Sequence, residues 1–225
     1  MIDAYSTFLD KFKIGKEEFL KFGIEMIMEL LPKKELIEKQ WEDLKIEIKH
    51  DKIGHRRNYG RDGGKSKGQK NEIINNIIKE LYGINESKID VTNNAEPTKV
   101  INRYSGHKKN KDIFNYQVSH IWGKTLNPYC FKSLWNMAYI PILYDPFTGH
   151  EAKSDMAIAF TKELKSEIFK FNKPQISEFN EIIKSTTPRL LEILNEINHS
   201  PKIEDKGKER IIKDIKENFG KEIDA

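Results

Sequence analysis

Three polar residues, His120, Asn136 and His150, have the types and spacing best suited to chemistry in this sequence. Asn136 follows His120 by sixteen positions and precedes His150 by fourteen. A histidine exchanges a proton near neutral pH and binds metal ions through a ring nitrogen, although a single histidine is more often structural. An asparagine amide donates and accepts hydrogen bonds, so it can fix a loop. The order of these residues along the chain, rather than either histidine alone, makes the set a candidate site.

The segments around these residues predict a hairpin followed by a helix. Side chains alternate over residues 114–122, which favours a strand. Residues 123–131 are typical of a loop, and residues 134–143 form a second apolar extended run. An Asp-Pro-x-Thr-Gly turn then leads into a helix that we expect to run to about Phe171. The residues expected on one face of the first strand are Phe114, Tyr116, Val118 and His120.

At these positions the sequence resembles the HNH nucleases, the ββα-metal group. The matching motifs are VSHIW, LWNMAYIP and TGHEAK, and the resemblance covers residues 114–160, about a fifth of the chain. It implies that His120 is the general base of phosphodiester hydrolysis and that Asn136 ties the intervening loop to the hairpin. It also implies that His150, at the start of the helix, binds a metal ion, and it includes Lys153 three positions later.

The sequence departs from the commoner pattern of this family at the metal site. Many relatives have an acid or a second histidine immediately before the base, whereas this chain has Ser119, whose hydroxyl is a poor ligand. The shell is therefore His150 with phosphate oxygens and water, or includes a nearby acid, of which Glu151, Asp145 and Asp155 are the closest. Oxygen-rich coordination with one imidazole favours Mg²⁺ or Mn²⁺.

A second departure concerns how the fold is braced. Many family members have a four-cysteine zinc site, whereas this chain has the single cysteine Cys130. We interpret Cys130 as a small apolar core residue rather than a nucleophile, and one cysteine excludes an intramolecular disulfide. Hydrophobic packing must then hold the unit together. The aromatic residues expected in its core are Trp122, Phe131, Trp135 and Phe147.

Basic residues are concentrated in one part of the chain. The net charge is +4, from 39 basic and 35 acidic residues, but residues 51–111 alone carry 14 basic and 7 acidic groups. Residues 52–70 contain five of the thirteen glycines and show neither helix nor strand period, so we predict a flexible segment that contacts a sugar-phosphate backbone. A solvated linker is the alternative. The candidate DNA-contacting cations are Arg56, Arg57, Arg61, Lys65, Lys67, Lys70, Lys108, Lys109 and Lys153.

The remaining sequence predicts mainly amphipathic helices. Apolar stripes at helical spacing cover residues 16–31, up to Pro32, and residues 33–49, and helical signals return at 70–82 and over 174–220. A short extended piece is expected at 88–91. The expected fold is α+β and mostly helical, with a ββα-metal unit embedded among amphipathic helices. The expected regions of one compact unit are a helical 1–50, a basic, glycine-rich 51–111, a nuclease core 112–172 and a helical 173–225.

The resemblance and the large helical additions imply a Type II restriction endonuclease acting on double-stranded DNA. A homodimer is expected, since two active sites related by a two-fold axis cut both strands of a palindrome. The alternatives are a homing or nicking HNH endonuclease and a DNA-binding module without catalytic activity. We expect no nucleotide cofactor.

The sequence shows no signal for membranes or export. No apolar run is long enough to span a bilayer, and the first residues carry acids and aromatics where a signal peptide needs an apolar stretch. We therefore expect a cytoplasmic protein that makes no membrane contact.

Overall fold

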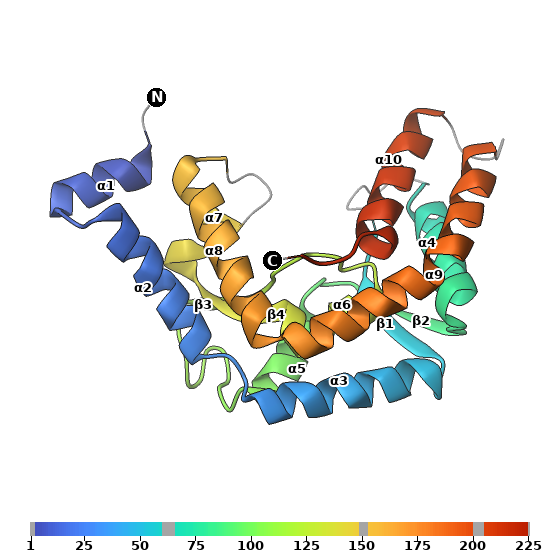
Figure 1. Ribbon diagram of the computed structural model, residues 1–225, viewed down its shortest axis with the longest axis horizontal. Helices are drawn as coiled ribbons and strands as arrows, with labels where there is room; N and C mark the ends of the chain where they lie inside the picture. Colours follow the sequence, from blue (N-terminus) through green and yellow to red (C-terminus); the bar gives the residue numbers. More distant parts are fainter. Residues whose placement is uncertain (1–2, 60–65, 149–152, 200–204, 225) are drawn as a thin grey trace.

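Most of the chain folds into helices, because apolar side chains recur at helical spacing over most of its length (Figure 1). The computed structural model describes residues 3–59, 66–148, 153–199 and 205–224, and its fold is α+β and mostly helical, as predicted. The α-helices are α1 (Ala4–Phe12), α2 (Lys16–Glu29), α3 (Lys34–Lys49), α4 (Ser66–Tyr82), α5 (Ala95–Tyr104), α6 (Pro128–Phe131), α7 (Asp145–Thr148), α8 (Asp155–Phe171), α9 (Lys173–His199) and α10 (Asp205–Ile215). The strands are β1 (Ile53–Arg57), β2 (Glu86–Asp90), β3 (Tyr116–His120) and β4 (Met137–Pro141). Two short 3₁₀ turns, η1 (Leu134–Asn136) and η2 (Ile142–Tyr144), flank β4, and a π-helical turn, η3 (Lys216–Gly220), follows α10.

The helices α2 and α3 confirm the predictions made from apolar periodicity. The stripe over residues 16–31 corresponds to α2, and the stripe over 33–49 corresponds to α3. Pro32 separates the two helices, since proline lacks the amide hydrogen that would continue α2. The apolar side chains that these helices bury are Phe19, Leu20, Ile24, Ile27, Ile37, Trp41, Leu44 and Ile48.

The strands β1 and β2 pair in parallel and are connected by α4, which makes a β-α-β unit. The prediction that residues 52–70 lack regular structure is wrong at both ends, because β1 occupies 53–57 and α4 begins at Ser66. Residues 60–65 lie outside the described residues. The inward-facing residues of β1 are Gly54 and Arg56, so no alternation of apolar side chains marks this strand. At Gly54 a Cβ atom would lie 2.9 Å from Ile84 Cδ1 and 3.1 Å from Cβ and Cγ of Pro128, so any other residue would have to displace these neighbours.

The strands β3 and β4 form the predicted antiparallel hairpin, with His120 opposite Met137 and Tyr116 opposite Pro141. Each face of the hairpin packs on its own core. On one face Val118, Met137 and Tyr139 join the larger core, which includes residues of α3, α4, α5 and α9. On the other face Ala138 and Ile140 pack with residues of α2 and α8. The hairpin is therefore the layer between the two cores of the protein.

The aromatic residues and the cysteine of this region largely confirm their predicted role in the core. Cys130, Phe131 and Trp135 are completely buried, and Phe147 is nearly so. Burial raises the pKa of the Cys130 thiol, as expected for an unreactive core residue. Trp122 is the exception, because it is only partly buried.

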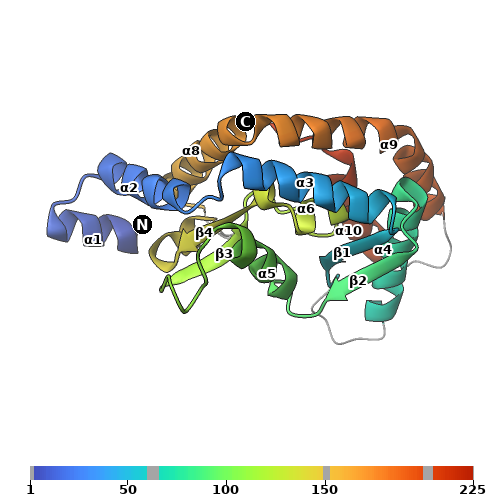
Figure 2. The same ribbon diagram turned by 90° about the horizontal axis from the view of Figure 1, so that it is seen from below.

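The long helix α9 lies beside α3 (Figures 1 and 2), and after α10 the chain ends close to α8 and α9. Glu178 of α9 accepts hydrogen bonds at Oε2 from Trp41 Nε1 (3.0 Å) and Lys45 Nζ (2.6 Å) of α3. Near the C-terminus, Asn180 exchanges two hydrogen bonds of 2.8 Å with the backbone of Ile223. In the described part of the chain no helix has the length and apolar character needed to cross a membrane.

Candidate functional site

His120 is the last residue of β3, and its ring lies between the hairpin and the loop that follows. The register pairs His120 with Met137, so its side chain lies on the face that also carries Val118 and Tyr139. Its Nε2 atom lies 2.9 Å from the carbonyl oxygen of Phe131. The rings of His120 and Phe131 stack, with centroids 5.6 Å apart and planes 12° apart. These two contacts fix both the position and the rotation of the imidazole.

The contact with Phe131 also determines which nitrogen of His120 carries the proton. A carbonyl oxygen only accepts hydrogen bonds, so we assign the hydrogen of the neutral ring to Nε2 and the free lone pair to Nδ1. Burial lowers the pKa of His120 to about 4; the hydrogen bond to the carbonyl raises it, and the charge of Arg57 lowers it further. His120 is thus neutral at pH 7, with a lone pair on Nδ1 that can accept a proton, but a pKa of about 4 makes it a weaker base than a histidine that titrates near neutral pH.

Asn136 is completely buried where the loop returns to the hairpin. It is the last residue of η1, one position before β4, rather than a residue of the strand as predicted. Its Oδ1 accepts from the backbone N–H of Trp122 (3.0 Å), and its Nδ2 donates to the carbonyl oxygens of Gly123 (3.0 Å) and Cys130 (3.1 Å). One amide therefore ties the loop to the hairpin at two separate segments, which is the arrangement that the resemblance implies for this residue.

Side chains outside the family motifs hold the segment that carries the Phe131 carbonyl. Gln40 of α3 donates from Nε2 to the carbonyl oxygen of Lys132 (3.1 Å) and accepts at Oε1 from the backbone N–H of Leu134 (3.0 Å). The ammonium of Lys132 lies 2.8 and 2.7 Å from the two carboxylate oxygens of Glu47, also in α3. These three side chains, Gln40, Glu47 and Lys132, form what we call the α3 brace. The brace supports the acceptor of the His120 hydrogen bond.

The carboxylate of Glu47 joins three elements. Besides Lys132, it contacts His55 of β1, whose Nε2 lies 3.4 Å from Glu47 Oε1. Burial raises the pKa of Glu47, but hydrogen bonds from His55 and Lys132 outweigh burial and lower the pKa to about 2. Sequence reasoning missed Gln40, Glu47 and Lys132. The available signal was that Gln40 and Glu47 are seven residues apart, in register with the apolar stripe of α3.

Ser119 is the predicted metal ligand that lies in the described part of the chain. Ser119 pairs with Ala138 and lies on the opposite face of the hairpin from His120. The remaining predicted ligands, His150 and Glu151, fall outside the described residues. The predicted metal site, with His150 and either Ser119 or Glu151, therefore stays a prediction.

The two other acids considered as ligands lie at the starts of helices. Asp145 is the first residue of α7, and Asp155 is the first residue of α8. Within the described ranges no group of three or more His, Cys, Asp or Glu side chains is arranged to hold a metal ion. The described residues therefore do not by themselves fit a divalent cation.

Arg56 is a clear correction among the predicted DNA-contacting residues, because its side chain is completely buried. Its guanidinium donates to Asn71 Oδ1 (2.8 Å), Asn75 Oδ1 (2.6 Å), Ser87 Oγ (3.1 Å) and the carbonyl oxygen of Arg57 (2.9 Å). Burial lowers the pKa of Arg56 to about 10. A guanidinium that is used in this way inside the protein does not reach a phosphate, so the prediction for Arg56 is wrong.

The other predicted cations are spread over several elements. Arg57 ends β1 and is partly buried, and Lys70 is partly buried on α4. Lys108 and Lys109 precede β3, at the end of the strand away from the histidine, and Lys108 is exposed. Lys153 is exposed just before α8. The side chains outside the described residues are those of Arg61, Lys65 and Lys67.

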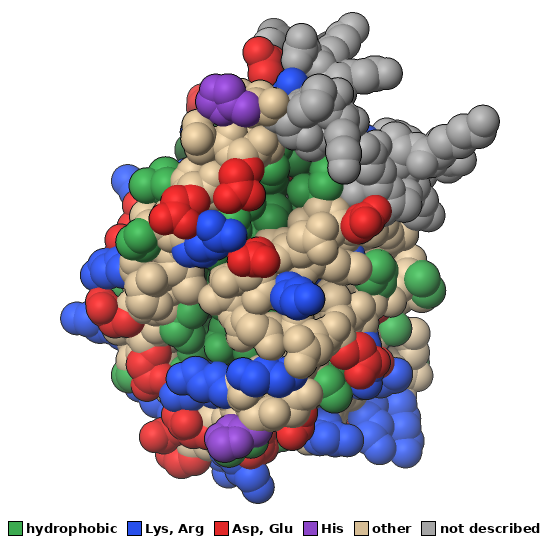
Figure 3. All heavy atoms as spheres, turned by 90° about the vertical axis from the view of Figure 1, so that its right-hand side faces the viewer, with side chains coloured by type: hydrophobic (Ala, Val, Ile, Leu, Met, Phe, Trp, Pro, Cys, Tyr) green, Lys and Arg blue, Asp and Glu red, His purple; other side chains and the backbone are tan. Residues whose placement is uncertain are grey.

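The end of the molecule formed by α4, α9 and α10 has mixed charge. Figure 3 shows Lys and Arg side chains interspersed with Asp and Glu on this face. Arg189 of α9 pairs with Glu192 (2.7 Å) and with Glu80 of α4 (3.0 Å), and Lys184 pairs with Glu181 (2.9 Å). This described face is therefore not a continuous basic surface.

The comparison with known proteins places the chain in a family without stating a role for it. The family described as "Uncharacterised protein PM1201" matches residues 32–224. The chain belongs to the PM1201 family. A relative from Pasteurella multocida (strain Pm70), "Uncharacterized protein PM1201", is 36% identical over 183 residues, which cover 81% of this chain and 80% of the relative. No solved structure matches the chain. The PM1201 match includes the hairpin and its α3 brace and begins after α2.

Proposed function

We propose that this protein is a site-specific endonuclease that hydrolyses phosphodiester bonds of double-stranded DNA, with His120 as the general base. The observation that carries the proposal is the arrangement of His120 and Asn136. A neutral imidazole at the end of β3 is held by the Phe131 carbonyl, while the buried Asn136 amide ties the loop to the hairpin. Because Nε2 donates its hydrogen to this carbonyl, the lone pair of the neutral ring is on Nδ1, where it can accept a proton.

The proposed reaction uses that lone pair. A water molecule bound at Nδ1 transfers a proton to the ring as its oxygen attacks phosphorus, and one P–O bond of the phosphodiester breaks. The leaving oxygen takes a proton from solvent, and the imidazolium returns its proton to solvent. Stacking on Phe131 and the hydrogen bond at Nε2 hold the ring in one orientation, so the Nδ1 lone pair points in the same direction throughout the reaction. Asn136 and the α3 brace act as positioning residues, because they hold the loop and not the substrate.

The proposal includes a divalent cation, Mg²⁺ or Mn²⁺, bound through His150. The described residues do not assemble a cation site on their own, so the ligand set beyond His150 stays a prediction. Such an ion would neutralise charge on the phosphate in the transition state.

We also propose that the enzyme is a homodimer of the Type II restriction class, acting in the cytoplasm, with a basic glycine-rich segment that contacts the DNA backbone. A DNA-binding module without catalytic activity is the second candidate. The observation that favours this second candidate is Ser119, a poor ligand at the position where many HNH nucleases have an acid or a second histidine.

Incubation of the purified protein with supercoiled plasmid and Mg²⁺, with an EDTA control, tests the proposal. We expect discrete linear fragments with Mg²⁺ and intact plasmid with EDTA. A smear of fragments would indicate nonspecific rather than site-specific cleavage. Nicked circles would favour the homing or nicking alternative. Intact plasmid with both Mg²⁺ and Mn²⁺, combined with retention of duplex in a gel-shift assay, would overturn the nuclease proposal in favour of the binding module.

A further inference from the structure

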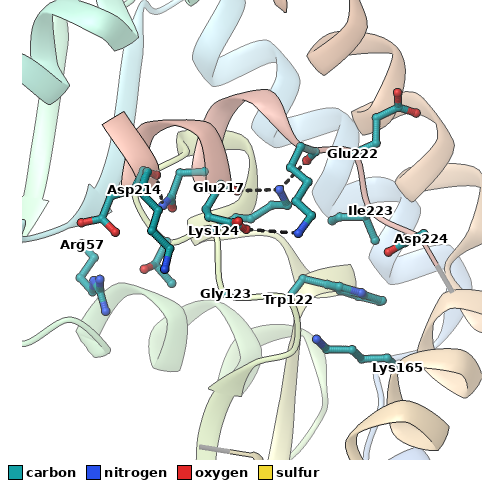
Figure 4. Close-up of a pocket in the computed structure, with 14 residues that line it drawn as sticks. Arg57, Trp122, Gly123, Lys124, Lys165, Asp214, Glu217, Glu222, Ile223 and Asp224 are labelled. Carbon is teal, nitrogen blue, oxygen red and sulfur yellow. Dashed lines mark hydrogen bonds and ion pairs between the residues drawn. The ribbon is translucent and has the colours of Figure 1, made fainter. Parts of the chain in front are cut away.

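A cavity of about 460 Å³ lies beside the hairpin, between the segment that follows β3, the middle of α8 and the C-terminal segment (Figure 4). Trp122 and Lys124 line it from the loop, Lys165 from α8, and Asp224 from the chain end. Arg57, whose charge lowers the pKa of the candidate base, lines the same cavity. The cavity therefore adjoins the proposed reaction site without including His120 itself.

Among the donors that line this cavity, the indole of Trp122 and the ammonium of Lys165 have no hydrogen-bond partner in the described part of the chain. The indole Nε1 of Trp122 is inaccessible to solvent and makes no hydrogen bond. The ammonium of Lys165 is partly buried and makes no hydrogen bond or ion pair with any described side chain. Burial lowers the pKa of Lys165, which indicates that the surrounding protein compensates its charge incompletely. Figure 4 shows both side chains in the lower right part of the cavity.

The acids near the cavity are largely engaged with other groups. Asp214 accepts a hydrogen bond from the Tyr59 hydroxyl (2.7 Å), and Glu217 pairs with Lys221 (3.5 Å). Glu222 pairs with Lys184 (3.6 Å). These three carboxylates are therefore not the partners of the two donors.

Asp224, which is exposed, is the acid whose charge acts on Lys165. Lys124 differs from Lys165, because its ammonium donates to the carbonyl oxygens of Glu217 (2.7 Å) and Lys221. Lys124 thus fastens the C-terminal wall. Lys165 is a partly buried cation that remains available to a ligand, and Lys213, which also lines the cavity, is exposed.

We propose that this cavity binds a phosphate group of the nucleic-acid backbone through Lys165 and the indole N–H of Trp122. A phosphate oxygen supplies the acceptor that Lys165 lacks, and charge-assisted hydrogen bonds of this kind are the stronger class. The indole N–H of Trp122 is inaccessible in this structure, so its hydrogen bond to the same anion requires a displacement of the Trp122 ring on binding. The cavity also has room for more than a single phosphate, as a nucleotide of a chain requires. The inference that the phosphate belongs to DNA rests on the proposed function. The inference that the ligand is an anion rests only on the residues of the cavity.

Binding of a short, fluorescently labelled DNA duplex in EDTA, measured by anisotropy over a range of salt concentrations, tests the inference without cleavage. We expect Lys165→Gln to weaken binding several-fold and to reduce the slope of log K against log salt by about one. Trp122→Phe keeps an aromatic ring and removes the N–H, so it weakens binding with the slope unchanged. Asp224→Asn removes the competing acid and strengthens binding. The matched control is Lys162→Gln, since Lys162 is exposed on the same helix.

An equal effect of Lys162→Gln and Lys165→Gln, or no effect of Lys165→Gln, would overturn the inference. Titration with inorganic phosphate, followed by the NMR signal of the Trp122 indole N–H, separates the two sources of a phosphate group. If inorganic phosphate shifts the Trp122 signal but Lys165→Gln binds the duplex as tightly as the wild type, the cavity binds a free anion, and the proposal is contradicted. If the wild-type protein cleaves plasmid but Lys165→Gln leaves the slope of log K against log salt unchanged, this inference is overturned and the proposed function stands. A reduced slope in a protein that never cleaves would leave the inference standing and overturn the proposed function.

Discussion

The two small sheets of this protein are each organised around a completely buried polar side chain, but the two side chains differ in charge. In the β3–β4 hairpin, the neutral amide of Asn136 makes its hydrogen bonds to backbone groups of one loop. In the β1–β2 unit, the cationic Arg56 is surrounded by neutral acceptors on α4, β2 and its own strand. No carboxylate is hydrogen-bonded to it among the described residues.

This difference separates a side chain that shapes a site from one that holds a fold together. The loop that Asn136 ties down contains Phe131, whose carbonyl orients His120. The contacts of Arg56 instead join β1 to α4 and β2. We therefore expect changes at Arg56 to act mainly on stability, and changes in the hairpin to act on cleavage as well.

Replacement of Arg56 by methionine has the largest expected effect on stability. It keeps an apolar stem but leaves the oxygens of Asn71 and Asn75 buried without their donor, so we expect a loss of about 4 kcal/mol in the free energy of unfolding. Urea denaturation followed by circular dichroism measures it. The control is Arg103→Met, at an exposed position of α5, with an expected change within about 0.5 kcal/mol. Equal effects of the two variants would remove Arg56 from the comparison.

The pH dependence of stability tests the environment of His120. Its pKa falls from 6.5 in the unfolded chain to about 4 in the folded protein, so the unfolded chain binds the proton more readily. The free energy of unfolding should therefore decrease as pH falls from 6.5 towards 4, by about 3 kcal/mol from this group. Urea denaturation at several pH values, compared with His120→Gln, isolates this contribution. Parallel curves for the two proteins would contradict the burial of a neutral ring.

Replacement of Asn136 by alanine should affect both stability and cleavage. It leaves the N–H of Trp122 and the carbonyl oxygens of Gly123 and Cys130 without this partner, at a cost of about 2 kcal/mol. Because the loop also carries the acceptor for His120, we expect kcat to fall more than KM changes, at temperatures where the variant is folded. Asn195→Ala, at an exposed position of α9, is the control. Unchanged kcat in a folded Asn136→Ala would limit Asn136 to a structural role.

The smallest expected effect is that of Glu47→Gln, which keeps the shape of the side chain and removes its charge. Lys132 loses its ion pair, at a cost of about 1 kcal/mol, because both groups are partly screened by solvent. We expect a several-fold decrease in kcat with KM unchanged, measured by steady-state cleavage of a labelled duplex. Glu38→Gln, on the exposed face of α3, provides the comparison. A change confined to KM would show that the brace acts on DNA binding instead.

Sequence pattern predicts the elements whose signals are local. Apolar periodicity is sufficient for α2 and α3, and alternation is sufficient for β3. The extended piece expected at 88–91 overlaps β2, which covers Glu86–Asp90. The strand β1 has no such signal, because its inward residues are Gly54 and Arg56. Its pairing with β2 spans the whole of α4, so nothing in the neighbouring sequence indicates it.

The candidate site is predictable in part. The order of His120 and Asn136 within a hairpin follows from alternation and spacing, and both residues lie at the predicted hairpin. The burial of Arg56 is not predictable, because charged side chains are rarely buried and its acceptors come from α4 and β2. The α3 brace and Lys165 escape sequence reasoning for the same physical reason. Their contacts with the loop and the cavity join segments that are distant in the sequence, so only the folded chain brings them together.

The most direct test of the account is single-turnover cleavage of a duplex already bound by His120→Ala. We expect this variant to bind the duplex with wild-type affinity and to cleave it at least about a hundredfold more slowly, since general base catalysis contributes that much or more. The control is His50→Ala, because His50 is exposed at the end of α3 and should cleave at the wild-type rate. Cleavage by His120→Ala at the wild-type rate, in the same bound complex, would contradict the role of His120 as the base.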